Sequence, residues 1–143
     1  LEKQIKDAVK KGGKILCGGT RIQRQGYYFA PTVITNTNEE MAVIKEEVFG
    51  PVAAIIIAEN EEGAVKRAND TQFGLGASIW SRNIERAEKL AEKIESGLVF
   101  INGMVKSDPR LPFGGIKNSG YGRELGQYGI KEFVNIKSVV VEN

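Results

Sequence analysis

Glu46-Glu47-Val48-Phe49-Gly50-Pro51-Val52 is the stretch around which the rest of this sequence is organised. Two carboxylates stand beside an aromatic ring, and a Gly-Pro bend follows at once. A carboxylate can accept hydrogen bonds from both hydroxyls of a ribose, and the ring of Phe49 could cover a flat heterocycle. The residues alone leave a second interpretation open, in which the glutamates are an exposed pair before a turn and Phe49 packs in the core.

The fold class follows from the segments after the bend. Val52 to Ala58 is an apolar run without polar alternation, which is typical of a parallel strand buried on both faces. Asn60 and Asn83 can each cap a helix, and short apolar strands are expected at 77–80 and 98–101. This order of strands and helices predicts an α/β domain with a mostly parallel sheet flanked by helices.

The N-terminal stretch predicts a helix, followed by short strands at 14–17 and 32–35. Apolar residues from Leu1 to Val9 recur on one helical face, yet no Ser, Thr, Asp or Asn precedes that face to cap it. The sequence also begins without a methionine. We therefore expect it to be the C-terminal part of a longer protein.

Composition excludes several classes of protein. The 143 residues can bury one core, and a net charge of +2 is too small to indicate nucleic-acid binding. No apolar stretch is long enough to cross a bilayer, and no signal peptide is present, so we expect no membrane partner. The sequence contains no histidine, so a Ser-His or Cys-His catalytic pair cannot be built within it.

Cys17 is the one cysteine, which excludes an internal disulfide and a cysteine-based metal site. It sits in a short apolar strand with no histidine to activate it. We interpret it as a small buried side chain, not as a nucleophile. The single cysteine and the missing signal peptide together favour a cytoplasmic location.

The C-terminal third begins with a long loop, 102–122, which contains prolines and glycines and which we interpret as an ordered binding loop. A surface connection held by its prolines is the alternative. A short helix at 123–133 and a strand at Val134 to Val141 follow. The glycines of this region match neither the dinucleotide fingerprint nor a phosphate-binding P-loop. The terminal strand could pair with a partner chain or be an edge of its own sheet.

Taken together, these stretches resemble the C-terminal part of the aldehyde dehydrogenase superfamily, and most of all its succinate-semialdehyde dehydrogenase-like members. The likeness covers nearly the whole chain, and its motifs stand in the family's order. The matching segments are 12–19, Phe29-Ala30-Pro31-Thr32, the stretch from Glu46 to Val52, Ala68-Asn69-Asp70-Thr71-Gln72-Phe73-Gly74-Leu75, Pro112-Phe113-Gly114-Gly115-Ile116-Lys117-Asn118-Ser119-Gly120 and Tyr121-Gly122-Arg123-Glu124-Leu125-Gly126.

The resemblance implies an enzyme that oxidises aldehydes to carboxylic acids with NAD or NADP. In that family a cysteine thiolate attacks the aldehyde, a hydride passes to the nicotinamide, and a glutamate assists hydrolysis of the thioester. Both of those residues lie upstream of the motifs seen here. No catalytic residue is therefore assigned to this chain, and the isolated chain is expected to be inactive. The implied domain organisation is a catalytic-domain fragment, 1–133, followed by an oligomerisation strand, 134–143.

The resemblance also assigns roles to individual residues. Glu47 matches the carboxylate that binds the nicotinamide ribose, and Phe49 matches an aromatic residue near the nicotinamide ring. Phe113 matches an aromatic residue of the aldehyde pocket. Ser107 stands five residues before Pro112, where succinate-semialdehyde dehydrogenases place a serine that holds the far carboxylate of the substrate. The residues on either side of Ser107 depart from that pattern.

The implied partners are a small-molecule aldehyde, with succinate semialdehyde as the example that Ser107 favours, and further copies of the chain. Val134 to Val141 matches the strand that joins a neighbouring subunit, so we expect a homo-oligomer. Two other hypotheses stay open: a non-catalytic interaction module that keeps the fold, and a small nucleotide-binding domain that works alone. The absence of a phosphate-binding glycine motif argues against the latter. An upstream segment with a cysteine would favour the enzyme over the module.

Overall fold

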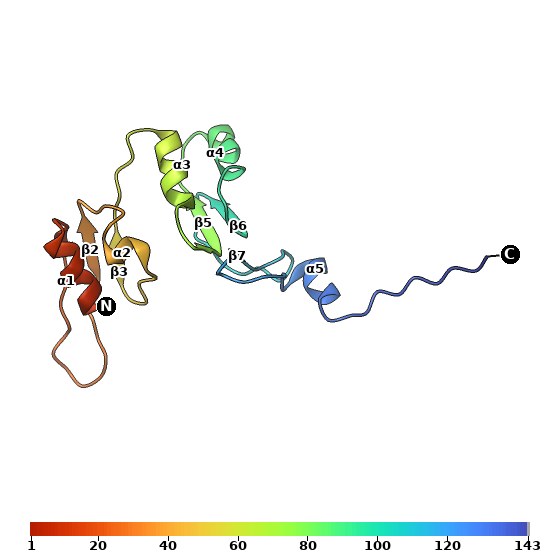
Figure 1. The fold of residues 1–143 in the computed structure, drawn as a ribbon, viewed down its shortest axis with the longest axis horizontal. Helices are drawn as coiled ribbons and strands as arrows, with labels where there is room; N and C mark the ends of the chain where they lie inside the picture. Colours follow the sequence, from red (N-terminus) through yellow and green to blue (C-terminus); the bar gives the residue numbers. More distant parts are fainter. Residues whose placement is uncertain (143) are drawn as a thin grey trace. The chain divides into compact units, whose positions relative to one another are not determined.

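The computed structural model describes residues 1–142. Two compact units divide the chain, with the boundary between Asn60 and Glu61. Figure 1 labels the helices of both units and most of their strands. The sequence predicted a different boundary, between a catalytic-domain fragment (1–133) and an oligomerisation strand (134–143). That boundary stays a prediction.

The first unit is a helix packed on a three-stranded sheet. Its elements are α1 (Glu2–Lys10), β1 (Lys14–Cys17), β2 (Thr32–Thr35), α2 (Ala42–Lys45) and β3 (Val52–Ala54). The strands lie in the order β1-β2-β3, with β1 antiparallel and β3 parallel to the central β2. The apolar face predicted for the first helix is the face that packs, since Ile5, Ala8, Ile34, Met41 and Val43 form the buried core.

The apolar run after the bend is a shorter strand than expected. Within the run Val52 to Ala58, β3 ends at Ala54, and the side chains of Ile55 and Ile57 are 44% and 78% exposed. The prediction of a strand buried on both faces was therefore wrong for this chain. β3 pairs only with β2 in the described residues, and among those residues no element packs over the side chains of Ile55 and Ile57, so they remain exposed.

Cys17 also differs from its predicted environment. The thiol is free and the residue is exposed, at the end of β1. A shift in register between Ile15 and Cys17 interrupts the ladder with β2 there, and such an irregularity turns a side chain away from the face it would otherwise share.

The second unit contains two helices beside a parallel strand pair, and then a long looped segment. Its elements are α3 (Glu61–Asn69), β4 (Phe73–Gly74), β5 (Gly76–Ile79), α4 (Ile84–Ala91), β6 (Leu98–Ile101), β7 (Ile116–Lys117) and α5 (Gly126–Lys131). β5 and β6 pair in parallel, whereas β4 and β7 pair antiparallel. The mixed α/β class is confirmed, with the strands divided among three small sheets.

The helix cap predicted at Asn83 is present. The backbone N–H of Arg86 donates to Asn83 Oδ1 at 2.9 Å, which satisfies one of the free donors in the first turn of α4. The side chain of Arg86 also forms an ion pair with Glu61 at the start of α3. α3 and α4 are therefore joined by a surface contact.

The C-terminal elements are shorter than the sequence suggested. The helix expected at 123–133 is α5, which starts only at Gly126 because Leu125 has a positive φ of 63° that a helix cannot contain. Val134 to Val141 forms no strand ladder within the described residues and is exposed. Its pairing with a neighbouring copy stays a prediction. In the described part of the chain, no helix has the length and apolar character needed to span a bilayer.

Candidate functional site

The Glu47–Phe49 segment links α2 to β3 in the first unit. Its side chains alternate, as they do in extended backbone: Val48 is half-buried and packs against the core of the unit, whereas Glu47 is exposed. Phe49 is 88% exposed, so the interpretation that it packs in the core is wrong. Val48 therefore anchors the loop, while the carboxylate and the ring remain accessible to a ligand.

The Gly-Pro bend fixes the far end of this loop. Pro51 O accepts from Thr32 N at 2.8 Å, which joins the bend to the start of the parallel ladder. A Cβ on Gly50 would lie 2.8 Å from Leu1 Cδ2, so a larger residue there would displace the Leu1 side chain. The loop is therefore short, and its end is tied to the sheet.

The two glutamates of the motif are in different situations. Gln4 Nε2 donates to Glu46 Oε2 at 3.0 Å, so this carboxylate is engaged by the protein. The Glu47 carboxylate forms no hydrogen bond or ion pair with any described residue, and only its backbone carbonyl accepts from Gln4, at 3.3 Å. An exposed carboxylate with free lone pairs beside an exposed ring suits the diol of a ribose and the face of a planar heterocycle.

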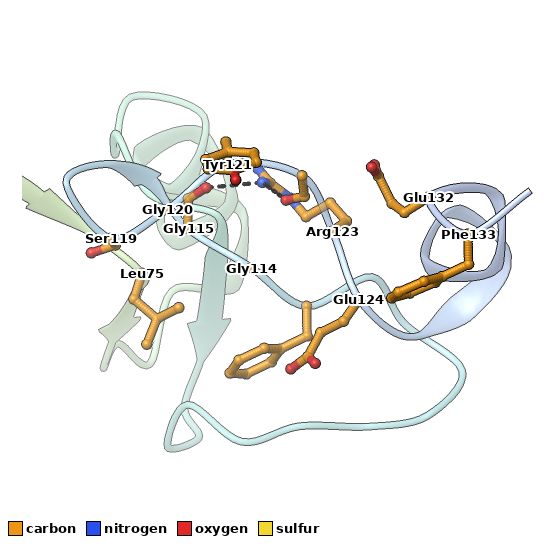
Figure 2. Close-up of a pocket in the computed structure, with 12 residues that line it drawn as sticks. Leu75, Gly114, Gly115, Ser119, Gly120, Tyr121, Arg123, Glu124, Glu132 and Phe133 are labelled. Atoms are coloured by element: carbon orange, nitrogen blue, oxygen red, sulfur yellow. Dashed lines mark hydrogen bonds between the residues drawn. The ribbon is translucent and has the colours of Figure 1, made fainter.

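The second unit contains a pocket of about 400 Å³. Figure 2 shows Leu75 and Ser119 on one side of it, and Glu132 and Phe133, at the end of α5, on the other. The Gly114–Glu124 segment runs between these two sides. The pocket is lined by Leu75, Phe113, Gly114, Gly115, Ser119, Gly120, Tyr121, Gly122, Arg123, Glu124, Glu132 and Phe133.

Backbone contacts build this pocket from two motifs that are distant in sequence. The antiparallel pair of β4 and β7 places Gly74 opposite Ile116. Ser119 Oγ accepts from Gly74 N at 2.9 Å. A Cβ on Gly97 would lie 1.7 Å from Gly114 O, so only glycine permits this approach. The long loop is therefore ordered, as the binding-loop interpretation requires.

Arg123 and Phe113 complete the wall. Arg123 Nη1 donates to Gly115 O at 2.9 Å and to Gly122 O at 2.6 Å, drawn as dashed lines in Figure 2. The backbones of Phe113 and Glu124 exchange two hydrogen bonds of 2.7 and 2.8 Å. Phe113 is half-buried at this bridge and lines the pocket. Sequence reasoning did not identify Arg123 as a support, because its partners are carbonyl oxygens that no side-chain pattern reveals.

Ser107 lies in the same unit but does not line this pocket. Its side chain is exposed. Close by, Arg110 donates to both carboxylate oxygens of Asp108, at 2.9 and 2.6 Å, and this pairing holds the pKa of Asp108 well below its usual range. Arg110 is thus already paired with Asp108, although its side chain stays exposed.

Comparisons with known proteins match nearly the whole length of this chain. The model of the aldehyde dehydrogenase family matches residues 1–139. An NADP(+) succinate-semialdehyde dehydrogenase of Mycobacterium bovis is 52% identical over 139 residues, which are 97% of this chain and 30% of that relative. The chain thus spans less than a third of the length of this curated relative.

Two solved structures are similar in fold as well as sequence. The succinic semialdehyde dehydrogenase of Streptococcus pyogenes in complex with NADP+ has a TM-score of 0.94 and 43% identity, over 99% of this chain and 31% of that one. An NAD-dependent aldehyde dehydrogenase of Sinorhizobium meliloti has a TM-score of 0.88 and 41% identity, over 92% of this chain and 26% of that one. Relatives named for NADP and for NAD therefore both occur.

Proposed function

Since this chain belongs to the aldehyde dehydrogenase family, we propose that it is the C-terminal portion of an NAD(P)-dependent enzyme that oxidises an aldehyde to a carboxylic acid. In this proposal the nucleophilic cysteine and the general base lie in a part of the enzyme outside this chain. The exposed Cys17 at the end of β1 has no part in catalysis. The observation that carries the proposal is the exposed pair of Glu47 and Phe49 within the family's motif.

The residues of the first unit fit a nicotinamide cofactor. Glu47 would hold the hydroxyls of the nicotinamide ribose, because its carboxylate is accessible and free of other described partners. Phe49 would pack near the nicotinamide ring with its exposed face. When bound, the cofactor supplies the acceptor for a hydride. The contribution of Glu47 and Phe49 is orientation, which can account for several kcal/mol of a barrier.

For the substrate, we propose a short semialdehyde such as succinate semialdehyde. The support is the names of the relatives from Mycobacterium bovis and Streptococcus pyogenes. Phe113 would form part of the aldehyde pocket, where its half-buried ring lines a cavity. Ser107 would bind the distal carboxylate. The pairing of Arg110 with Asp108 makes Arg110 a poor second ligand for that carboxylate. A cytoplasmic location remains a prediction from the sequence.

Glu47→Gln in the full-length protein tests the role of the loop. The amide keeps the shape of the side chain but removes its charge, so we expect hydride transfer to slow more than thioester hydrolysis. Single-turnover formation of the reduced cofactor and the steady-state rate of acid release separate the two steps. The control is Glu59→Gln, which changes an exposed carboxylate elsewhere in the same unit. Equal loss in both half-reactions, or no loss, would contradict the proposal.

We further propose that Val134 to Val141 pairs with a second copy of the chain. The support is that this segment is rich in valine and exposed: Val139, Val140 and Val141 are 79%, 79% and 83% exposed. Such a segment offers free backbone donors and acceptors to a partner strand. The same surface would serve the alternative of a non-catalytic assembly module, which predicts association without aldehyde oxidation in the full-length protein.

Sedimentation of this chain tests the association. We expect a symmetric oligomer, which Val139→Pro would dissociate because proline cannot donate to a strand ladder. Val139→Thr keeps the backbone donor and the β-branched shape, so it should associate like the unchanged chain. A clean monomer at high concentration before any substitution would rule the proposal out.

A further inference from the structure

One side of α1 carries three polar residues, Gln4, Asp7 and Lys11, which we call the polar stripe. Their spacing of three and four positions places them on one face of the helix. That face lies beside the apolar residues Ile5 and Ala8, which are buried in the core. Gln4 and Asp7 are half-buried, whereas Lys11 follows the last turn and is more exposed.

Every member of the stripe contacts the segment that leads into the Glu47 loop. Lys11 Nζ donates to Glu40 O at 2.6 Å. Asp7 Oδ2 accepts from Ala42 N at 2.8 Å. Gln4 Nε2 reaches both glutamates of the motif, as described above. The contacts thus occur in order along the segment from residue 40 to residue 47.

The hydrogen bond from Ala42 N to Asp7 Oδ2 stabilises the start of α2. A four-residue helix is too short to be stable by itself, and its own N-cap residue, Met41, provides no side-chain hydrogen bond. Asp7 takes the place of that cap from another helix. Lys11 approaches the same carboxylate at 2.8 and 3.0 Å and lowers the pKa of Asp7, so the acceptor remains charged.

We propose that the polar stripe of α1 positions the Glu47–Phe49 loop for cofactor binding, with Asp7 as the principal positioning residue. This inference rests on the proposed function of Glu47 and extends it to residues that do not touch the cofactor. The stripe fixes the start of the loop through α2, while the bend at Pro51 fixes its end. Releasing the start would leave Glu47 and Phe49 attached but poorly oriented.

Asp7→Ala in the full-length protein tests the inference. Without cofactor, we expect hydrogen exchange to be about tenfold faster at Ala42, Glu46 and Gly50, whose N–H groups donate hydrogen bonds, because a hydrogen bond to a charged acceptor is lost. With cofactor, hydride transfer should slow by about tenfold while thioester hydrolysis is unchanged, since misplacement affects only the step that needs orientation. A purely structural role would slow both steps alike.

Two further variants sharpen the test. Glu85→Ala removes an equivalent carboxylate, which pairs with Lys89 four positions along α4 at 2.6 Å, and it should leave the loop and the ratio of the two steps unchanged. Asp7→Asn keeps an oxygen that can accept from Ala42 N, so it should restore most of the protection even if the alanine variant folds poorly.

The outcomes separate this inference from the proposed function. Unchanged exchange at Ala42, Glu46 and Gly50 in Asp7→Ala, or an equal increase in Glu85→Ala, would overturn the positioning role alone. Faster exchange in Asp7→Ala with no effect of Glu47→Gln on hydride transfer would overturn the proposed role of Glu47, and with it the link from the stripe to catalysis.

Discussion

The two loops that carry the candidate site residues are held in place by different kinds of contact. The loop from 46 to 51 is short, and its start depends on side chains of α1 that reach backbone and carboxylate groups. The loop that carries Phe113 is long, and it is fixed by a strand pair and by glycine backbones in close approach. A single side-chain substitution can therefore loosen the loop from 46 to 51. The loop that carries Phe113 depends on how closely its backbone packs against other backbone segments.

This difference in contacts suggests different functions for the two loops. A loop held by a few polar side chains has low local stability, as segments that move during function usually do. A loop built into a ladder keeps its shape and suits a pocket wall. We therefore expect substitutions to separate the two loops by the size of their effect on stability.

Gly97→Ala should have the largest effect. The added Cβ would lie 1.7 Å from Gly114 O, and neither backbone can move aside without breaking the wall of the pocket. We expect a loss of about 3 kcal/mol or more in the free energy of unfolding of the second unit. Denaturant unfolding of the chain measures it. Gly103→Ala is the matched control, because its nearest neighbour, Phe100 Cδ1, is 3.8 Å away. Similar losses in both variants would contradict the proposed close fit.

Ser119→Ala should have an intermediate effect. It removes the acceptor of Gly74 N in a partly buried site, and we expect a loss of about 1 kcal/mol in the same unfolding free energy. Ser107→Ala serves as its control, since that exposed side chain should leave stability unchanged. If the two serine variants were equally stable, the loop would depend less on the β4–β7 region than its geometry indicates.

Acidification should have the smallest effect, and it should act on the first unit. Lys11 lowers the pKa of Asp7 below its ordinary 3.8, and Lys45 lowers that of Glu40 below 4.5. A depressed pKa in the folded state stabilises the fold above the ordinary pKa, and this contribution is lost as the pH falls through the folded value. NMR signals of residues 40–47 should therefore shift as the pH falls below about 4, with a small change in stability because Glu40 is exposed and Asp7 is only partly buried.

The Asp7→Asn variant provides the check on this acid effect. It should weaken the pH dependence at Ala42 while leaving the titration of Glu40 in place. An unchanged pH response at Ala42 would show that the carboxylate of Asp7 is not the group that titrates there.

Local signals in the sequence predicted much of the fold. The strand at 98–101 has the predicted bounds, and so do those at 14–17 and 32–35. The cap at Asn83 is formed as expected. These features depend on residues close together in the chain, and a sequence pattern reports such contacts directly.

The features that sequence reasoning missed depend on distant neighbours. β4 and β7 contain two residues each, too few for any periodicity, and each exists because the other lies opposite. The run after Pro51 has strand composition, but a ladder needs a partner strand: within this run β2 pairs only with Val52–Ala54, and Ile57 lies beyond β3 and is exposed. For the same reason, the composition of Val134 to Val141 does not by itself form a ladder.

The candidate site was only partly readable in the sequence. Glu47 and Phe49 stood out as an acid and a ring before a bend, and the structure leaves both accessible. The supports of the loop did not stand out, because Gln4 and Asp7 are ordinary polar residues of an amphipathic helix. Their contacts appear only once α1 is packed against residues 40–47.

The pairing of β4 with β7 also bears on the order in which the chain folds. Gln72 and Asn118, which bond beside this pair, are 46 positions apart in sequence, so a long segment must be closed before the contact can form. The sheet of the first unit is complete by residue 54. During synthesis from the N-terminus, the loop from 46 to 51 can therefore form early. The pocket wall that contains Gly114 and Gly115 can form only after the residues around Asn118 have left the ribosome.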